Sequence, residues 1–294
     1  MGRAAVLALI ALLSALILGP NRPVLADGFL GFKADPYKAT TSRAARENAV
    51  ESIPLDQLDT KAQAKVSSVL SDLSVFRRMP IRVIDCDPEL YLFLLRNPDV
   101  VVNIWEVLKI GSLKVKQVET GKFALTELAG TQCTVEFLYR SHNVHVAYAE
   151  GTYTGPLFAR PVKGRCLLVL KTGYVREPDG RYYITTRLDT FLSIQPGGAE
   201  LLTKTFHPLV GKTADLNFVQ SMAFLGSLSR TAEVNSRGVQ RLASRLERVQ
   251  PEARQRLAEL AAEIPGKYTA ASRRKTVRAP VPQVANRSTG QAKQ

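Results

Sequence analysis

The sequence predicts an α+β fold in which an antiparallel sheet packs against a long C-terminal helix, with extra helices at both ends. Two observations carry this prediction. Between residues 113 and 194, segments rich in β-branched and aromatic residues alternate with turn residues at hairpin spacing. Beyond residue 199, apolar residues occupy well over half of a helical circumference, which is typical of a helix covered on most sides.

The first 26 residues predict a secretory signal, which we exclude from the fold. Arg3 precedes an apolar run from Ala4 to Leu18, and Val24-Leu25-Ala26 supplies a cleavage site. A retained membrane anchor is the alternative, although the run is shorter than the roughly 20 residues that a span needs. We therefore expect an exported protein, periplasmic or secreted, whose mature chain starts near Asp27.

Two segments lie between the signal and the predicted sheet. Residues 27–53 are polar and without periodicity, so we expect a flexible linker. Residues 54–80 predict one amphipathic helix that packs on the following domain, because apolar residues recur at every third or fourth position. This apolar stripe consists of Leu58, Ala62, Val66, Val69, Leu73 and Phe76. A short strand is expected at 81–85.

Residues 85–108 predict two short helices joined at an angle. Asp87 is suited to cap the first helix, and Pro88 fits its first turn, where a missing N–H costs nothing. Pro98 then breaks the helix near Asn97 and allows a second one to start. The second helix carries Trp105, the only tryptophan of the chain.

Six strands follow, and their connections are short enough for an antiparallel sheet. Tight-turn sequences separate several of them, including Thr120-Gly121 and Glu177-Pro178-Asp179-Gly180. In the last strand, alternate residues from Tyr182 to Leu192 form a more apolar face, which we expect to be covered. The predicted strands span residues 113–118, 122–127, 132–139, 144–153, 165–175 and 181–194.

The C-terminal third predicts a long helix that is broken at His207-Pro208, followed by amphipathic pieces at 238–248 and 251–264. The formal net charge is +14, and about half of it lies in residues 266–294, which contain no Asp or Glu. We expect this segment to be a basic, disordered tail. Its basic residues are Lys267, Arg273, Arg274, Lys275, Arg278, Arg287 and Lys293.

The positive charge of this tail indicates which partners the protein could bind. An anionic envelope surface is accessible to an exported basic tail. Nucleic acid is not expected as a partner, because the basic residues are not interleaved with aromatic ones that would stack on bases.

The order of elements resembles the START-like (SRPBCC) helix-grip superfamily of lipid-binding and polyketide cyclase-like proteins. The stretch CDPELYLFLLRNPDVVVNIW carries the resemblance, with Pro88, Glu89, Pro98 and Trp105 in matching places. The resemblance covers about residues 81–235. It implies a curved sheet that grips the long helix, a helix pair that closes one end of the sheet, and an apolar cavity between them. The N-terminal helix and a helical extension at 236–265 depart from the family pattern.

No catalytic or metal-binding pattern is present. The GxSxG, P-loop, HExxH and GxGxxG motifs are absent, and His142 and His145 are expected on opposite faces of a strand, so we expect neither a metal nor another cofactor. Cys86, Cys133 and Cys166 are more consistent with buried free thiols than with one disulfide. An enzyme is therefore less favoured than a binding protein, although the sequence leaves that question open.

Asp215 is the main polar candidate for a ligand site. By helical spacing it falls between Phe218 and Val219 on the apolar side of the long helix, where a carboxylate needs a partner such as Arg187 or a polar ligand group. Arg187 also shares a strand face with Asp189, which is typical of a solvated pair. The full set of candidate ligand-binding residues is Trp105, Tyr148, Tyr174, Arg187, Asp215, Phe218 and Met222.

Two functions remain from the sequence. The first is an exported binding protein that holds a lipid-like or other hydrophobic ligand in the cavity at the cell envelope. The alternative is a non-enzymatic structural or interaction protein of the envelope that acts through its basic tail and helical additions. An apolar cavity of roughly 300 Å³ or more favours the first, and a filled core favours the second.

Overall fold

The computed structural model describes residues 37–111, 113–128, 130–154, 161–195 and 207–278. The expected secretory signal at 1–26 and the first part of the predicted long helix, residues 199–206, lie outside the described residues. None of the described helices is long and apolar enough to cross a membrane.

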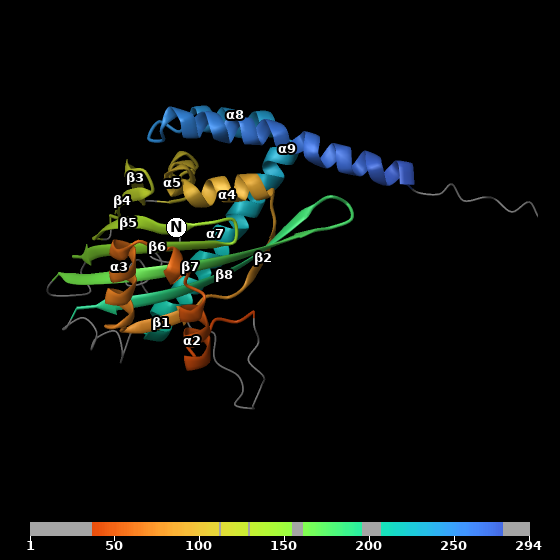
Figure 1. The fold of residues 1–294 in the computed structure, drawn as a ribbon. Coiled ribbons are helices and arrows are strands. Elements are labelled where there is room, and N and C mark those ends of the chain that lie inside the picture. The colour runs from red at the N-terminus through yellow and green to blue at the C-terminus, as the bar shows by residue number, and fades with distance from the viewer. Residues whose placement is uncertain (1–36, 112, 129, 155–160, 196–206, 279–294) are drawn as a thin grey trace, which may run out of the picture.

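The described strands form one curved antiparallel sheet in the order β1-β8-β7-β6-β5-β4-β3, with β2 also paired to β8 (Figure 1). All six β-rich segments predicted between residues 113 and 194 form strands, and their antiparallel pairing is confirmed. The strands are β1 Val75–Arg78, β2 Arg82–Asp85, β3 Lys114–Glu119, β4 Lys122–Thr126, β5 Thr131–Arg140, β6 Val144–Tyr153, β7 Val162–Arg176 and β8 Tyr182–Ile194.

Helices cover both faces of this sheet, and the long helix α7 runs along one of them (Figure 1). This is the α+β helix-grip architecture, with additional helices at both ends. The helices are α2 Arg43–Glu51, the 3₁₀ turn η1 Leu55–Gln57, α3 Thr60–Leu70, α4 Pro88–Arg96, α5 Pro98–Val107, α7 His207–Val234, α8 Ser236–Ser244 and α9 Pro251–Arg278.

Two separate hydrophobic cores flank the sheet. The inner core joins the sheet to α4, α5, α7, α8 and α9, and the outer core joins it to α2 and α3. Neighbouring residues on one strand alternate between them, as Ala147 and Leu168 do in the inner core and Val146 and Leu167 in the outer one. The central strands are therefore buried on both faces, whereas one covered face was expected.

The N-terminal region differs from its prediction in two ways. The expected linker at 27–53 contains α2, whose cap Ser42 accepts a hydrogen bond from the Ala45 N–H. The expected single helix at 54–80 ends at Leu70, and Phe76 lies on β1, with its ring centroid 5.1 Å from that of Phe191. Pairing of β1 with β8 overrides the local helical spacing, because Val75 and Phe76 fit a buried strand well.

The predicted helix pair is confirmed. Asp87 caps α4 through Oδ1, which accepts from the N–H groups of Glu89 and Leu90 at 3.0 Å each. Pro88 and Pro98 occupy the first turns of α4 and α5. The break at Asn97 turns α5 so that Trp105 packs on Phe224 of α7, with ring centroids 5.6 Å apart.

The C-terminal additions are more ordered than expected. The segment 266–294 was predicted to be disordered, but α9 continues as a helix to Arg278. Lys267 is also not a free tail residue, since its Nζ lies 3.1 Å from both Asp87 Oδ2 and Glu89 Oε2 at the start of α4. These contacts join the start of the segment to α4, a tertiary interaction that the local sequence does not reveal. Residues 279–294 of the predicted tail lie outside the described residues.

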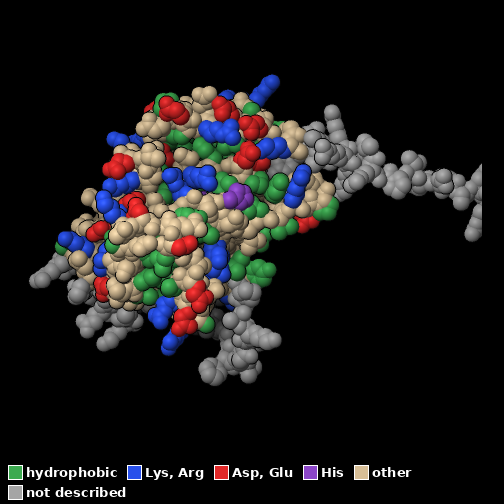
Figure 2. Space-filling view, in the orientation of Figure 1, with side chains coloured by type: hydrophobic (Ala, Val, Ile, Leu, Met, Phe, Trp, Pro, Cys, Tyr) green, Lys and Arg blue, Asp and Glu red, His purple; other side chains and the backbone are tan. Residues whose placement is uncertain are grey.

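The exposed surface mixes charges of both signs. In Figure 2, Lys and Arg side chains are interspersed with Asp and Glu over the face shown, especially above the sheet. The net positive charge therefore does not form a single basic field on this face.

A buried ionic network holds α2 to the sheet. Asp189 on β8 is fully buried, and Arg78 contacts it through Nε at 2.6 Å and Nη2 at 3.0 Å. Arg187 Nε lies 3.4 Å from the same carboxylate. Arg78 also donates to the Ala45 carbonyl and to Asn48 Oδ1 on α2. The expectation that Arg187 and Asp189 form a solvated pair is wrong, because α2 and β1 cover Asp189.

We predict that Asp189→Asn destabilises the protein by about 3 kcal/mol or more, because two guanidinium groups lose their buried counter-charge. Urea unfolding followed by circular dichroism measures the change. Arg43→Gln, which breaks an exposed ion pair with Glu47 on α2, is the matched control and should leave the midpoint nearly unchanged. A loss equal to that of the control would show that the network adds nothing to stability.

Candidate functional site

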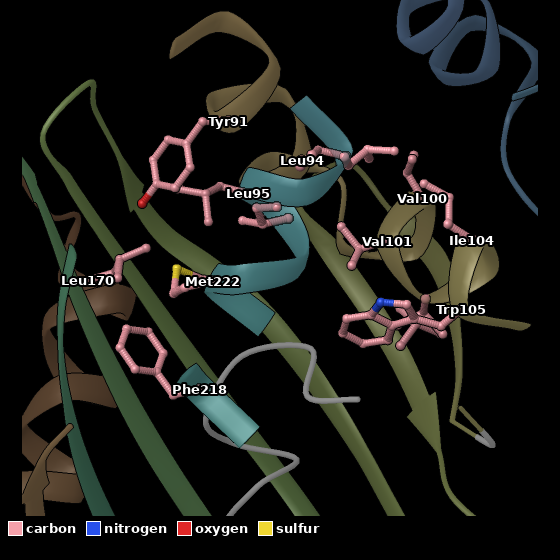
Figure 3. Close-up of a cluster of buried hydrophobic side chains, with 14 of the residues drawn as sticks. Tyr91, Leu94, Leu95, Val100, Val101, Ile104, Trp105, Leu170, Phe218 and Met222 are labelled. Carbon is pink, nitrogen blue, oxygen red and sulfur yellow. The ribbon is translucent and has the colours of Figure 1, made fainter. Parts of the chain in front are cut away.

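Three of the predicted ligand-binding residues meet in the inner core. Trp105, Phe218 and Met222 are each at most 2 % exposed. Figure 3 shows Phe218 and Met222 on α7 with Leu170 of β7 nearby, while Trp105 projects from α5. The three residues share the inner core, but none of them lines the cavity described below.

Two other candidates face the outer core instead. Tyr148 donates a hydrogen bond to Glu150, and Lys65 of α3 lies 5.5 Å from its ring centroid. Arg187 lies beside the buried Asp189. The structure therefore does not place Tyr148 and Arg187 with Trp105, because their strand positions point to the opposite face of the sheet.

Asp215 has a different partner from the one considered above. Arg77 of β1 contacts it through two nitrogens, with Nε 2.7 Å from Oδ1 and Nη2 close to Oδ2. The pairing with Arg187 is wrong, because Arg77 faces α7 whereas Arg187 faces the outer core. Asp215 therefore joins β1 to α7 as one half of a bidentate ion pair.

Tyr174 lies at the end of the inner core where the β5–β6 turn meets α4. Its hydroxyl donates to the His142 carbonyl at 2.9 Å, and its ring centroid is 4.2 Å from that of His142. Tyr91 of α4 stacks edge-on against Tyr174 and hydrogen-bonds Thr172 through its hydroxyl, with 3.1 Å between the two oxygens. These aromatic side chains close this end of the core.

His145 on β6 is the residue that sequence reasoning missed. It is 3 % exposed, and neither of its ring nitrogens has a hydrogen-bond partner among the residues that the structure describes. A neutral imidazole carries one hydrogen-bond donor and one acceptor. Burying both without a partner in an apolar site lowers the stability of the folded protein. A ligand atom or a water molecule placed against this ring would remove that cost.

The unpaired ring borders a small cavity of about 10 Å³ between the sheet and α4. This volume is close to the minimum for one water molecule and far below the roughly 300 Å³ that a ligand pocket needs. By the volume criterion derived from the sequence, this cavity favours the structural alternative over a preformed ligand pocket. A larger ligand here must displace side chains. Besides His145, the cavity is lined by Leu95, Phe137, Ala147, Leu168, Leu170 and Leu188.

Burial fixes the protonation state of His145. Desolvation, as the largest cause, together with the positive charges of Arg96 and Arg140 and a smaller effect of His142, lowers its pKa to about 4. The ring is therefore neutral at physiological pH and is able to donate one hydrogen bond and accept another.

The described residues show no group of three or more His, Cys, Asp or Glu side chains that could hold a metal ion. Cys86, Cys133 and Cys166 are buried and free, as expected. Burial raises the pKa of Cys133 to about 12, so its thiol is not a nucleophile at neutral pH.

No family model and no curated protein sequence matches the chain. Among solved structures it is similar to the hypothetical protein jhp0584 from Helicobacter pylori, with 15 % identity, TM-score 0.30, and coverage of 49 % of this chain and 84 % of that one. Ara h 8.0201 aligns with 14 % identity, TM-score 0.28, and coverage of 50 % and 99 %. Truncated norcoclaurine synthase from Thalictrum flavum aligns with 10 % identity, TM-score 0.26, and coverage of 50 % and 95 %. At these TM-scores the fold assignment rests on the strands and helices described above.

We predict that stability falls as the pH is lowered from about 6.5 to about 4. The unfolded chain binds a proton at its imidazole below about pH 6.5, whereas folded His145 binds one only near pH 4. This difference removes at most about 3 kcal/mol of folding free energy over that interval.

Urea midpoints of the parent and of His145→Leu, measured between pH 7.5 and 4, isolate this loss as the difference between the two curves. His142→Gln, in the exposed turn nearby, is the control and should keep most of the parental pH dependence, because His142 affects the pKa of His145 less than burial and the two arginines do. Identical curves for the parent and His145→Leu would contradict a buried neutral imidazole.

Proposed function

We propose that the protein binds a hydrophobic ligand in the inner core beside His145, between the sheet, α4 and α7. The observation that carries this proposal is the buried imidazole without partners, which lines an otherwise apolar cavity. Buried polar groups in proteins are nearly always hydrogen-bonded, so an exception inside the enclosed face of a helix-grip fold is a candidate ligand contact.

Entry of such a ligand requires the inner core to open. Met222 lies nearby on α7, and its unbranched side chain changes shape more readily than leucine or isoleucine does. The ligand class we propose is lipid-like, apolar along most of its length with one group that hydrogen-bonds His145. We place the activity at the cell envelope, on the strength of the sequence of residues 1–26. The proposal assigns no reaction.

The proposal predicts that filling the cavity removes the ligand. Ala147→Leu adds three carbons against His145, so ligand that copurifies from the native host should fall at least tenfold, at a stability cost of about 1–3 kcal/mol. Mass spectrometry of organic extracts, normalised to folded protein, gives the occupancy.

Ala62→Leu makes the same change in the outer core and serves as the control, which should retain the ligand. Equal occupancy in both variants would contradict the position of the site. If no preparation yields a ligand and no hydrophobic probe binds, the binding proposal is wrong.

A second candidate function concerns the C-terminal end. Figure 1 shows α9 projecting beyond the rest of the molecule, and the sequence from Lys267 onward is basic and contains no Asp or Glu. We propose that this end associates with anionic surfaces, such as those of envelope lipids, and so serves as an interaction element. A projecting basic helix favours such contacts through long-range attraction.

The triple variant Arg273→Gln, Arg274→Gln, Lys275→Gln should lose most of its sedimentation with vesicles that contain phosphatidylglycerol. Vesicles of phosphatidylcholine alone should bind neither protein, and raising the salt to about 0.5 M should release the parent, because screening shortens the attraction. The double variant Arg237→Gln, Arg241→Gln removes exposed charges from α8 and should bind like the parent. Unchanged sedimentation of the triple variant would rule out this role for the C-terminal end.

A further inference from the structure

Two arginines without ion-pair partners lie at the end of the inner core next to His145. Arg96 is the last residue of α4 and Arg140 the last residue of β5, and both are exposed. Arg96 Nη2 donates to the carbonyl of Ser141 at 3.5 Å, so the ends of these two elements meet. Within the residues that the structure describes, neither guanidinium forms an ion pair.

Neighbouring residues link the arginines to the cavity, which neither guanidinium lines itself. Arg140 is the cross-strand partner of His145 in the β5–β6 pairing, so the two side chains leave the sheet on the same face. Its guanidinium lies 5.6 Å from the Phe137 ring centroid, and that ring is 6.5 Å from the His145 ring. Leu95, which precedes Arg96, lines the same cavity. A path of ring contacts thus runs from Arg140 through Phe137 to the buried imidazole, and Arg96 lies at the end of the helix that carries Leu95.

Ordinary structural roles explain part of this arrangement. A positive charge at the end of α4 is favourable against the helix dipole, and Arg140 gains from the face of the Phe137 ring. Neither role explains why His145 is buried without a partner, or why both charges flank that ring.

We infer that the ligand is an anionic amphiphile whose headgroup lies between Arg96 and Arg140 and whose apolar part enters the inner core past His145. This inference rests on the proposed binding function and adds the chemical class of the ligand. The guanidinium groups supply charge-assisted hydrogen bonds to the headgroup oxygens. His145 hydrogen-bonds a further oxygen of the headgroup, and Phe137 and Leu95 cover the first carbons of the chain.

Binding of oleate and of oleyl alcohol to the full chain tests the inference, because the two probes share a chain and differ in headgroup charge. The parent should bind oleate at least tenfold more tightly than the alcohol. The double variant Arg96→Gln, Arg140→Gln should lose that preference while keeping its affinity for the alcohol. Arg237→Gln, an exposed arginine of α8 without an ion pair among the described residues, is the control and should keep the preference.

A monoalkyl phosphate of equal chain length separates the two headgroup chemistries, since tighter binding than oleate identifies a phosphate and weaker binding a carboxylate. Inorganic phosphate should not compete, because the apolar chain supplies part of the affinity. Equal affinity for oleate and the alcohol overturns the inference and leaves the binding function standing. If the chain binds neither oleate nor oleyl alcohol, both the inference and the proposed binding function are wrong. A preference for oleate that survives in the double variant, with its fold verified by circular dichroism, also overturns the placement of the headgroup.

Discussion

The double burial of the central strands is the constraint on which the rest of the structure depends. Strands β6, β7 and β8 are buried at consecutive positions over their central parts, so each face of the sheet needs its own cover. The helix pair and α7 cover one face. Without α2 and α3, the other face of the sheet would expose the outer core to water. The N-terminal helices are therefore part of the domain, and the buried Asp189 is acceptable only because Arg78 and α2 enclose it.

Much of the fold could be predicted because its signals are local. Proline positions and a capping aspartate located α4 and α5, and turn residues located the strands. The failures occurred where the signal is weak or distant. Helix α2 buries only alanines, which leave no apolar stripe, and Phe76 matches a helical stripe while its partner Phe191 is far away in sequence.

The candidate site was predicted in part. Phe218 and Met222 followed from the periodicity of α7, whereas the partner of Asp215 is 138 residues away and has no sequence signal. From the sequence, His145 was considered only as a metal ligand, although the alternation of side chains along its strand predicts that it faces the core. A single imidazole among leucines gives no sign in sequence that its nitrogens will be unpaired. A buried imidazole without hydrogen bonds lowers the stability of the fold. Proteins retain such unpaired polar groups mainly where function requires them.

The pairing of β1 and β2 with β8 also determines the order in which the chain can fold. Both N-terminal strands find their partner only after residue 194 has been synthesised, and Asp87 meets Lys267 across 180 residues. Contacts of this sequence separation form slowly, because a long loop must close before they contribute. The first half of the chain accordingly has no complete hydrophobic core of its own while the ribosome is still at work. The N-terminal strands are therefore the last to join the sheet, and β8 is the strand that receives both of them.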